Sequence, residues 1–556
     1  MALHISDIVQ TSGSGILLGS AALFLFLGIA ATAWRAIYSL YFHPLRNFPG
    51  PWYTACTSLP LGIAGLSRSE PEWLWSLVKR YGTEDGVPIR ITPDLLLFYK
   101  ASHLRDIYWD PVCNTKGGIY QHEAIGPKSL FTTISTDDHR KLRKALGGSF
   151  WSVGTLKKTW EGKIDDLIVN WTANRRRDEE SGKAIILSNK TSEFAADVMT
   201  TFLFTTPWGF VKNDRDERGM LHAWRYGMGL FGLAVRWRFM REVILSSKLR
   251  DYLLPKLSDD QGNGWLMAQS AREISGRHDL LQRQEKGEAT LASGTPPVFK
   301  DALQHAIDAR IDDEPLSDMQ KLANMTLLIQ AGADTTGTGL GATLRFILKY
   351  PEVLAKVRAE LSAADAKGLL SHPVVQYDET KRHLPYLSAC IRESLRVHPP
   401  IPNLFSRVTP SPEGKTIGGH HIPAGTEILS HAVVVQRDAD AFGSRPNEFR
   451  PERWLESEER TARMDAYMYT FGMGLRGCLG KELALMELHK LVPEVLRRFE
   501  VQVLEEGRYC ACGVAMGWER GFIPGVSSLR VRNPSKSTRV RWGTRSPASN
   551  LGGPSA

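Results

Sequence analysis

The order of apolar and polar positions divides the chain into an apolar N-terminal stretch, a long body and a polar tail. In the body, residues 155–275 and the segment from Ser317 onward have apolar residues at helical spacing. Short apolar or alternating runs at 88–92, 95–99 and within 500–532 are typical of strands. The pattern therefore predicts a mainly α fold with a small β portion.

The apolar N-terminal stretch, residues 15–34, carries no charge and is long enough to cross a bilayer as a helix. A cleaved secretory signal is the alternative, because Ala31-Thr32-Ala33 imitates a cleavage site. The apolar core is too long for a signal, however, and Asp7 stands where a signal has a basic region. Arg35 and Arg46 follow the stretch and place the rest of the chain in the cytosol. The prediction is a short lumenal N-terminus (1–14), a transmembrane helix (15–34) and a stiff proline-rich hinge (35–51).

Composition points to one large folded domain after the hinge, residues 52–532. The chain has 556 residues without an internal repeat, and its 42% hydrophobic and 23% charged content excludes disorder throughout. The net charge of +9 does not indicate a nucleic-acid partner, because four basic residues without an acid lie in the tail 533–556, which is predicted to be disordered. The six cysteines show no paired framework, which favours reduced thiols.

One cysteine, Cys478, lies in the glycine-rich stretch 471–480 (FGMGLRGCLG), directly before a predicted helix. Its glycines at 472, 474, 477 and 480 allow positive φ and a close approach to a flat ligand. The N–H groups at the helix start and the charge of Arg476 favour a thiolate, which can ligate iron. A cysteine among glycines is more often a buried structural thiol, so both interpretations stand on this stretch alone.

The stretch Phe471-x-x-Gly474-x-Arg476-x-Cys478-x-Gly480 resembles the haem-binding loop of the cytochrome P-450 family, the haem-thiolate monooxygenases, at every fixed position. The resemblance implies that Cys478 is the proximal iron ligand of haem b. It further implies that Phe471 shields the sulfur and that Arg476 pairs with a haem propionate. A thiolate ligand donates electron density to the iron and favours O–O cleavage, which explains a cysteine at this position.

A second motif, Ala331-Gly332-x-Asp334-Thr335-Thr336, lies inside the long helix predicted from the N-cap Ser317. Each interior glycine costs about 1 kcal/mol relative to alanine, and hydroxyl groups that bond back to freed carbonyls would open a kink. A weak helical segment of unrelated purpose is the alternative. The motif matches the family's oxygen-activation motif, which implies that Thr335 orients dioxygen above the iron and Asp334 relays protons.

Two further segments contain charged residues that the resemblance joins into one network. Glu393 and Arg396 lie at i, i+3 in a helix predicted from about 384 to 397, where such a pair is commonly a surface feature worth about 0.2–0.5 kcal/mol. The resemblance joins them to Arg453 in the run 449–454 and implies a structural Glu-Arg-Arg network that locks the loop presenting the cysteine.

Three more residues are expected at the haem propionates. His139 and Arg143 are spaced i, i+4 and face the same way on a helix, although a solvated basic face is the alternative. The resemblance favours propionate binding, because many family members have a Trp-x-x-x-Arg pair here, and His139 stands in place of the tryptophan. Arg407, in Phe405-Ser406-Arg407, resembles an arginine that reaches a propionate.

Together these motifs predict a cytochrome P-450 fold preceded by one transmembrane helix, most like fungal microsomal members of the pisatin-demethylase type. The resemblance implies a monooxygenase that inserts one oxygen atom of O₂ into an apolar small organic substrate, often in specialised metabolism. Its expected partners are the lipid bilayer and an NADPH-cytochrome reductase, with cytochrome b5 as a further candidate. The expected location is the endoplasmic reticulum membrane, single-pass, with the haem-thiolate catalytic domain (52–532) in the cytosol.

Two other functions remain in view. A haem-thiolate isomerase or dehydratase would act without O₂ or a reductase, but such enzymes commonly lack the acid-alcohol pair that Asp334 and Thr335 provide here. A non-catalytic haem-binding or sensor protein would have no need for the glycine-rich helix segment. Catalysis is therefore favoured.

Overall fold

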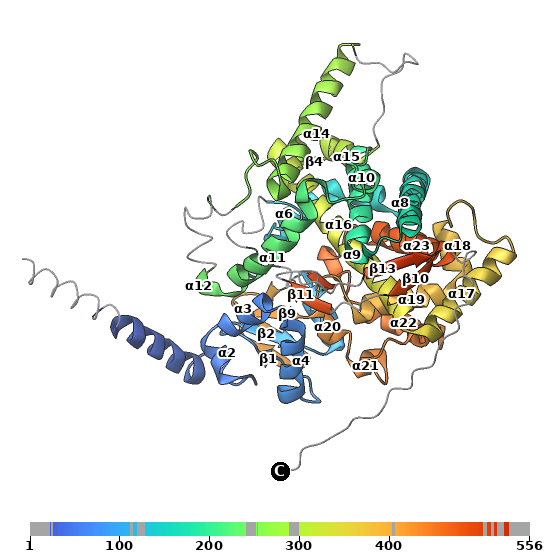
Figure 1. The fold of residues 1–556 in the computed structure, drawn as a ribbon. Coiled ribbons are helices and arrows are strands. Elements are labelled where there is room, and N and C mark those ends of the chain that lie inside the picture. Colours follow the sequence, from blue (N-terminus) through green and yellow to red (C-terminus); the bar gives the residue numbers. More distant parts are fainter. Residues whose placement is uncertain are drawn as a thin grey trace, which may run out of the picture.

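The computed structural model describes residues 23, 26–111, 115–118, 120, 128–240, 252, 254–288, 300–402, 406–503, 509–512, 516–519 and 528–532. The predicted lumenal N-terminus (1–14) and basic tail (533–556) lie outside them, as do residues 15–22, 24 and 25 of the predicted transmembrane segment. Residues 26–41 are helical and project from the body (Figure 1). Within the described part of the chain, no helix combines the length and apolar character needed to cross a membrane.

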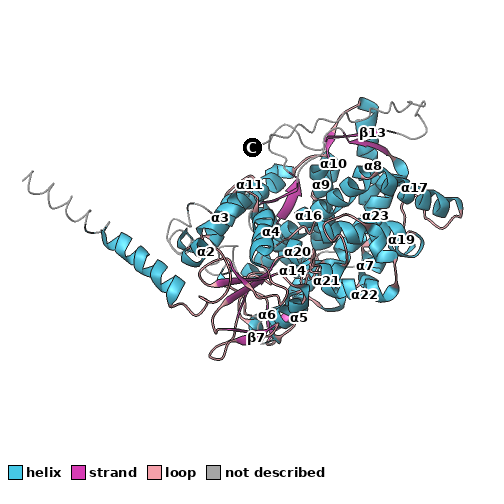
Figure 2. Cartoon of the chain, turned by 90° about the horizontal axis from the view of Figure 1, so that it is seen from below, coloured by secondary structure: helices cyan, strands magenta, loops and turns pink. Residues whose placement is uncertain are grey.

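Helices form most of the body, as the sequence predicts, and the smaller β portion lies toward its edges (Figure 2). The first half contains α2 (Trp52–Cys56), α3 (Leu59–Leu66), α4 (Glu70–Tyr81), α5 (Leu104–Tyr108), α6 (Thr136–Leu146), α7 (Val153–Thr159), α8 (Glu161–Ser181), α9 (Leu187–Phe204), α10 (Phe210–Asn213), α11 (Met220–Arg236), α12 (Arg238–Met240) and α14 (Gly262–Glu285). The second half contains α15 (Ala302–Asp308), α16 (Asp318–Lys349), α17 (Pro351–Ala366), α18 (Tyr377–His383), α19 (Pro385–Val397), α20 (Ala432–Val435), α21 (Ala439–Phe442), α22 (Glu458–Tyr467) and α23 (Lys481–Arg498).

The largest sheet has the strand order β1 (Ile89–Arg90), β2 (Leu95–Phe98), β9 (Glu427–Ser430) and β6 (Arg407–Val408). Its two central strands are parallel, with Leu96 opposite Ile428, and β6 is antiparallel to β9, so Arg407 also lies opposite Ile428. Near the C-terminus, β13 (Ser528–Arg532) pairs with β10 (Glu500–Val503) and with β3 (Ile185–Ile186). Short hairpins complete the β portion: β4 (Arg310–Ile311) with β5 (Glu314–Pro315), β7 (Lys415–Ile417) with β8 (His420–Ile422), and β11 (Tyr509–Cys512) with β12 (Met516–Glu519).

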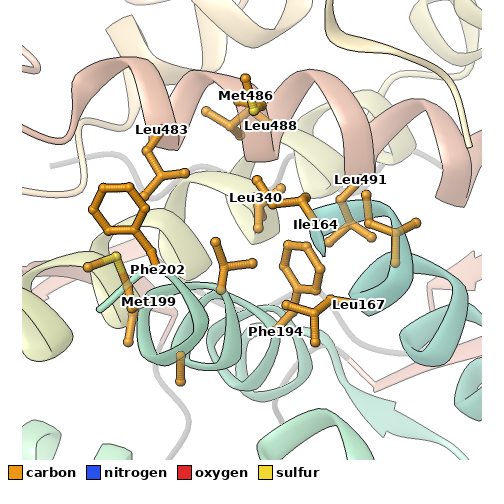
Figure 3. Close-up of a cluster of buried hydrophobic side chains, with 14 of the residues drawn as sticks. Ile164, Leu167, Phe194, Met199, Phe202, Leu340, Leu483, Met486, Leu488 and Leu491 are labelled. Carbon is orange, nitrogen blue, oxygen red and sulfur yellow. The ribbon is translucent and has the colours of Figure 1, made fainter. Parts of the chain in front are cut away.

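The helix α16 runs through the centre of the body and packs on α9, α14, α19 and α23. Ser317 caps its start, as predicted: its Oγ accepts a hydrogen bond from Gln320 N (3.2 Å) and the Gln320 side chain bonds back to Ser317 N. Figure 3 shows the apolar side chains that join α8, α9, α16 and α23, including Phe202, Leu340 and Leu483, all buried. Burial of this core fixes α16 relative to α23, which follows the cysteine loop.

Glycines in α16 allow the close approach of α9. A Cβ atom at Gly337 would lie 2.5 Å from Cα and 2.7 Å from N of Ser192, and one at Gly332 would lie 2.5 Å from Cγ of Met199. The helix is continuous over 318–349, and Thr335 Oγ1 donates to Ala331 O at 2.6 Å. The predicted back-bonding hydroxyl is therefore present, but these two glycines serve helix packing in addition to any effect on the local helix.

We expect Gly337→Ala to destabilise the protein by about 1–3 kcal/mol, because the added methyl group meets the backbone of α9 and overpacks the interface. Gly339→Ala is the matched control in the same helix. Its Cβ would lie 3.6 Å from Leu395 Cδ2, an ordinary contact, so higher helix propensity should make it neutral or stabilising by up to about 1 kcal/mol. Denaturant unfolding of both variants tests this, and equal stability of the two would contradict the packing argument.

Candidate active site

The two glycine-rich motifs line one cavity of about 270 Å³. On one wall, α16 contributes Ala331, Gly332 and Thr335. The cysteine loop contributes Phe471 and Cys478, with other members of the stretch 471–480. Residues that are more than 130 positions apart in the sequence therefore meet at a single site.

Two of the four glycines in the cysteine loop have the positive φ angle that the sequence analysis allowed for. Gly472 has φ 66° and Gly474 has φ 65°, and a Cβ at Gly474 would lie 2.9 Å from the carbonyl carbon of Tyr108. Gly477 and Gly480 do not use the left-handed region, because their φ values are −60° and −86°. Those two positions need no glycine for backbone conformation.

The Cys478 side chain is surrounded by protein and opens onto the cavity. Burial raises the pKa of its thiol, although N–H groups of Gly480 and Lys481 and the charges of Arg143 and Lys481 act in the opposite direction. The helix start therefore favours the thiolate, as predicted, but the nearby charges are those of Arg143 and Lys481 and not that of Arg476, and burial outweighs them. A thiolate here needs a further positive partner inside the cavity, and a metal ion would be such a partner.

One end of the cavity is lined by basic side chains: Lys116, His139, Arg143, Arg407 and Arg476. Arg407 is almost fully buried, whereas Arg476 donates to the carbonyl oxygens of Thr133 (2.9 Å) and Ile134 (2.8 Å) ahead of α6. Burial and the positive field of the neighbouring arginines and Lys116 lower the pKa of His139 to about 3. His139 is therefore a neutral hydrogen-bonding group, as the tryptophan of the family pattern is.

Arg143 contacts the cysteine loop directly, since its Nη1 donates to Gly477 O at 2.7 Å. Its positive charge thus lies near Cys478, where sequence reasoning placed only Arg476. Arg143 joins α6 to the loop on the side that presents the sulfur.

The chemistry of this lining fits a planar iron porphyrin with two carboxylates. Glu487 is the one acidic residue in the described lining, and burial raises the pKa of its carboxyl well above the usual range, so it is neutral. The basic end therefore lacks an anionic side chain in the lining, and each buried cation there raises the free energy of its neighbours. Two propionates would add negative charge at this end, and the thiol on the facing loop would supply the iron ligand.

A buried carboxylate, Glu393 in α19, gathers charged groups behind the cysteine loop. It accepts hydrogen bonds from Arg396 Nε and Nη2 (both 2.8 Å), Arg453 Nε (2.9 Å), Trp454 Nε1 (2.9 Å) and Arg450 N (2.8 Å). The side chains of Glu393, Arg396 and Arg453 are fully buried. Burial opposes ionisation, but the bonds and charges of Arg396 and Arg453 outweigh it and lower the pKa of Glu393.

Gln436 connects this network to the cysteine loop. Its main-chain carbonyl accepts from Arg396 Nη1 (2.7 Å), and its side-chain oxygen accepts from Tyr469 N (2.8 Å) and Thr470 Oγ1 (2.9 Å). Those two residues directly precede Phe471. The network thereby acts on the loop through three named hydrogen bonds.

The acid and the alcohol of the α16 motif point in different directions. Thr335 lines the cavity, but Asp334 is fully buried and is not among the lining residues. Its Oδ1 accepts from Arg225 Nε (2.9 Å) and Nη2 (2.7 Å) on α11 and from Ser192 Oγ (3.2 Å) on α9. Asp334 Oδ2 has no hydrogen-bond partner among the described residues, which leaves it able to accept a proton or a water hydrogen.

Sequence reasoning missed four residues of the site: Lys116, Arg225, Gln436 and Trp454. Lys116 lies in a segment without apolar periodicity, and Arg225 lies within residues 155–275, for which the apolar spacing predicts helix and no site. Trp454 directly follows Arg453 in the run 449–454, and this adjacency was the one sequence signal that it belongs to the Glu393 network. Gln436 gave no signal in the sequence.

Comparison with known proteins identifies similar chains. A family model described as "Cytochrome P450" matches residues 114–512. Cytochrome P450 monooxygenase cicH of Emericella nidulans is 45% identical over 506 residues, which cover 84% of this chain and 91% of the relative. Cytochrome P450 monooxygenase ABA1 of Pyricularia oryzae is 29% identical over 490 residues (86% and 91%). Quiannulatic acid synthase of Emericella variicolor is 25% identical over 500 residues (89% and 93%).

We expect Glu393→Gln to destabilise the protein by about 3–5 kcal/mol, because it leaves two buried guanidinium groups without their counter-ion. Glu456→Gln is the matched control, since Glu456 pairs with Arg450 and Arg460 at the surface, where such pairs contribute less than about 1 kcal/mol. Unfolding free energy and haem content per chain measure the difference. A Glu393 variant as stable as the Glu456 variant would show that the network is not structural.

Proposed function

This chain belongs to the cytochrome P450 family of monooxygenases, and from that premise we propose that it is a membrane-anchored enzyme that oxidises an apolar small organic substrate in fungal specialised metabolism. The observation that carries the proposal is the shared cavity of Cys478 and Thr335, with its basic end. The names of the relatives, among them a synthase for quiannulatic acid, support the metabolic setting.

Bound haem supplies the iron centre at which dioxygen is activated, with electrons from NADPH through a cytochrome reductase and with cytochrome b5 as a further candidate donor. In our proposal Cys478 Sγ ligates the iron, and the ring of Phe471 shields the sulfur. His139 and the three arginines at 143, 407 and 476 hold the propionate end by hydrogen bonds and charge.

Thr335 has its hydroxyl at the cavity wall, where it can orient dioxygen and donate a hydrogen bond once it releases Ala331 O. Asp334 is the proton source behind it. Because Arg225 and Ser192 occupy Oδ1, the proton passes through Oδ2 and an intervening water, or after the carboxylate turns toward the cavity. Arg225 thus sets when Asp334 can act.

The substrate is apolar because the cavity walls away from the basic end are apolar. They include Leu328 and Ile401, with Trp224 from α11. An apolar substrate buried against these side chains gains binding free energy from the water that it displaces.

The membrane assignment rests on the sequence of residues 15–34, on the basic residues that follow, and on the projecting helix 26–41, where Phe26, Ile29 and Trp34 are exposed. We propose that 15–34 anchors the chain in the endoplasmic reticulum membrane, that 35–51 is a hinge, and that the catalytic domain (52–532) faces the cytosol. The lumenal N-terminus (1–14) and the disordered basic tail (533–556) complete this arrangement.

The first experiment is a reduced, carbon-monoxide-bound difference spectrum of the membrane fraction. The native chain should show a Soret band shifted strongly to the red by thiolate ligation, and Cys478→Ser should lose it. Cys56→Ser, a cysteine outside the cavity, is the control and should keep the band. A native spectrum without the shift, from folded and haem-loaded protein, would refute thiolate ligation.

Proton delivery can be tested in the same holoenzyme with a reductase. Thr335→Ala should divert reducing equivalents to hydrogen peroxide, and Asp334→Asn should slow NADPH consumption by about 10²-fold, since it removes the general acid. Thr338→Ala, which lies in the same helix outside the cavity lining, should behave as the native enzyme. The readouts are peroxide released per NADPH consumed and the rate of NADPH consumption. A native ratio in Thr335→Ala or a native rate in Asp334→Asn would count against the assigned role.

A further inference from the structure

Lys116 is fixed beside β6 by main-chain hydrogen bonds. Val408 N donates to Thr115 O (3.0 Å), and Gly117 N donates to Ser406 O (3.2 Å), so the two segments bracket a β-bridge between Lys116 and Arg407. The lysine therefore has a defined position at the basic end of the cavity and lines it.

The ammonium group of Lys116 is buried, with 5% of the residue exposed. It lies 4.5 Å from the ring centroid of Tyr120 and 5.0 Å from that of Phe131, and it donates to the carbonyl oxygen of Phe131. Among the residues that the structure describes, it forms no ion pair with a carboxylate. Lysine is rarely buried without such a partner, because the desolvated charge costs free energy.

A count of charges sets Lys116 apart from its neighbours. Arg143 donates to Gly477 O of the cysteine loop, Arg407 donates to Ser406 O, and Arg476 donates to Thr133 O and Ile134 O, and we have assigned these three arginines to the haem propionates. Lys116 is the remaining cation of the described lining. Burial, followed by the charges of Arg476 and Arg407, lowers the pKa of Lys116 well below its usual range, so an anion in the cavity would restore the ammonium form.

We propose that Lys116 binds a carboxylate inside the cavity, carried either by the substrate or by a haem propionate. The inference rests on the proposed haem-thiolate function and deepens it, since it names the polar group that orients an otherwise apolar ligand. The ammonium group itself lies against the rings of Tyr120 and Phe131, and it donates one N–H to Phe131 O, so its other N–H donors can serve a carboxylate. An amphipathic acid, with its carboxylate at Lys116 and its apolar body along Leu130 and Phe131, fits this lining.

The test uses the full-length holoenzyme as native protein, as Lys116→Met and as Lys128→Met. Methionine keeps the length of the side chain and removes the charge, and Lys128 is an exposed lysine of the same region that serves as the control. Each protein is titrated with a panel of straight-chain and aromatic carboxylic acids and their methyl esters, and binding is followed by the change in the Soret spectrum. The rate at which haem transfers to apomyoglobin is measured in parallel.

If Lys116 binds a carboxylate of the substrate, native protein and Lys128→Met should bind an acid about tenfold or more tightly than its methyl ester. Lys116→Met should lose this preference, while its rate of haem transfer stays unchanged. If Lys116 binds a haem propionate instead, haem should transfer faster from Lys116→Met, and none of the three proteins should prefer an acid over its ester. If neither quantity differs between Lys116→Met and Lys128→Met, the proposal is overturned. A protein that lacks the red-shifted carbon-monoxide band would instead refute the proposed function itself, so the two failures are distinguishable.

Discussion

The buried carboxylate of Glu393 is the constraint on which the geometry of the site depends. Its ionised form is stable because five hydrogen bonds reach it from α19 and from the segment 450–454. Any shift between those segments would leave a buried charge partly unpaired, which costs several kcal/mol. Gln436 passes this rigidity to Tyr469 and Thr470, and so to the loop that ends at Cys478.

The protein treats its two buried charge clusters differently. At Glu393 one carboxylate bonds two guanidinium groups, and main-chain carbonyls accept their other N–H groups, so the protein itself supplies the partners of this cluster. In the cavity, the Cys478 thiol has a raised pKa and the basic end has no acid in its described lining except neutral Glu487. Haem binding therefore completes the electrostatics of the cavity, and the rigid network provides the frame that receives it.

The sequence predicted features that depend on neighbouring residues, such as helices and caps. It did not predict features that depend on the folded surroundings of a side chain, such as its orientation and burial. The mainly α fold, the N-cap at Ser317 and the terminal strands follow from periodicity and capping, and the structure agrees with them. The position of Asp334 outside the cavity lining was not predictable, because its partner Arg225 lies 109 positions away and helical spacing does not show which side chains meet. The raised pKa of Cys478 was missed for a related reason: desolvation depends on all the surrounding chain, whereas the helix start is visible locally.

The helix α11 links the wall of the cavity to the acid behind it. Trp224 lines the cavity and the next residue, Arg225, holds Asp334, so neither can move far without the other. At the far end of the same helix, Arg236 forms a buried ion pair with Glu70 of α4 at 2.7 Å. Two buried ion pairs thus hold α11 at its two ends, and displacement of the helix would break one of them. Because the first of these pairs contains Asp334, a displacement of Trp224 would also displace Arg225, the partner of the Asp334 carboxylate.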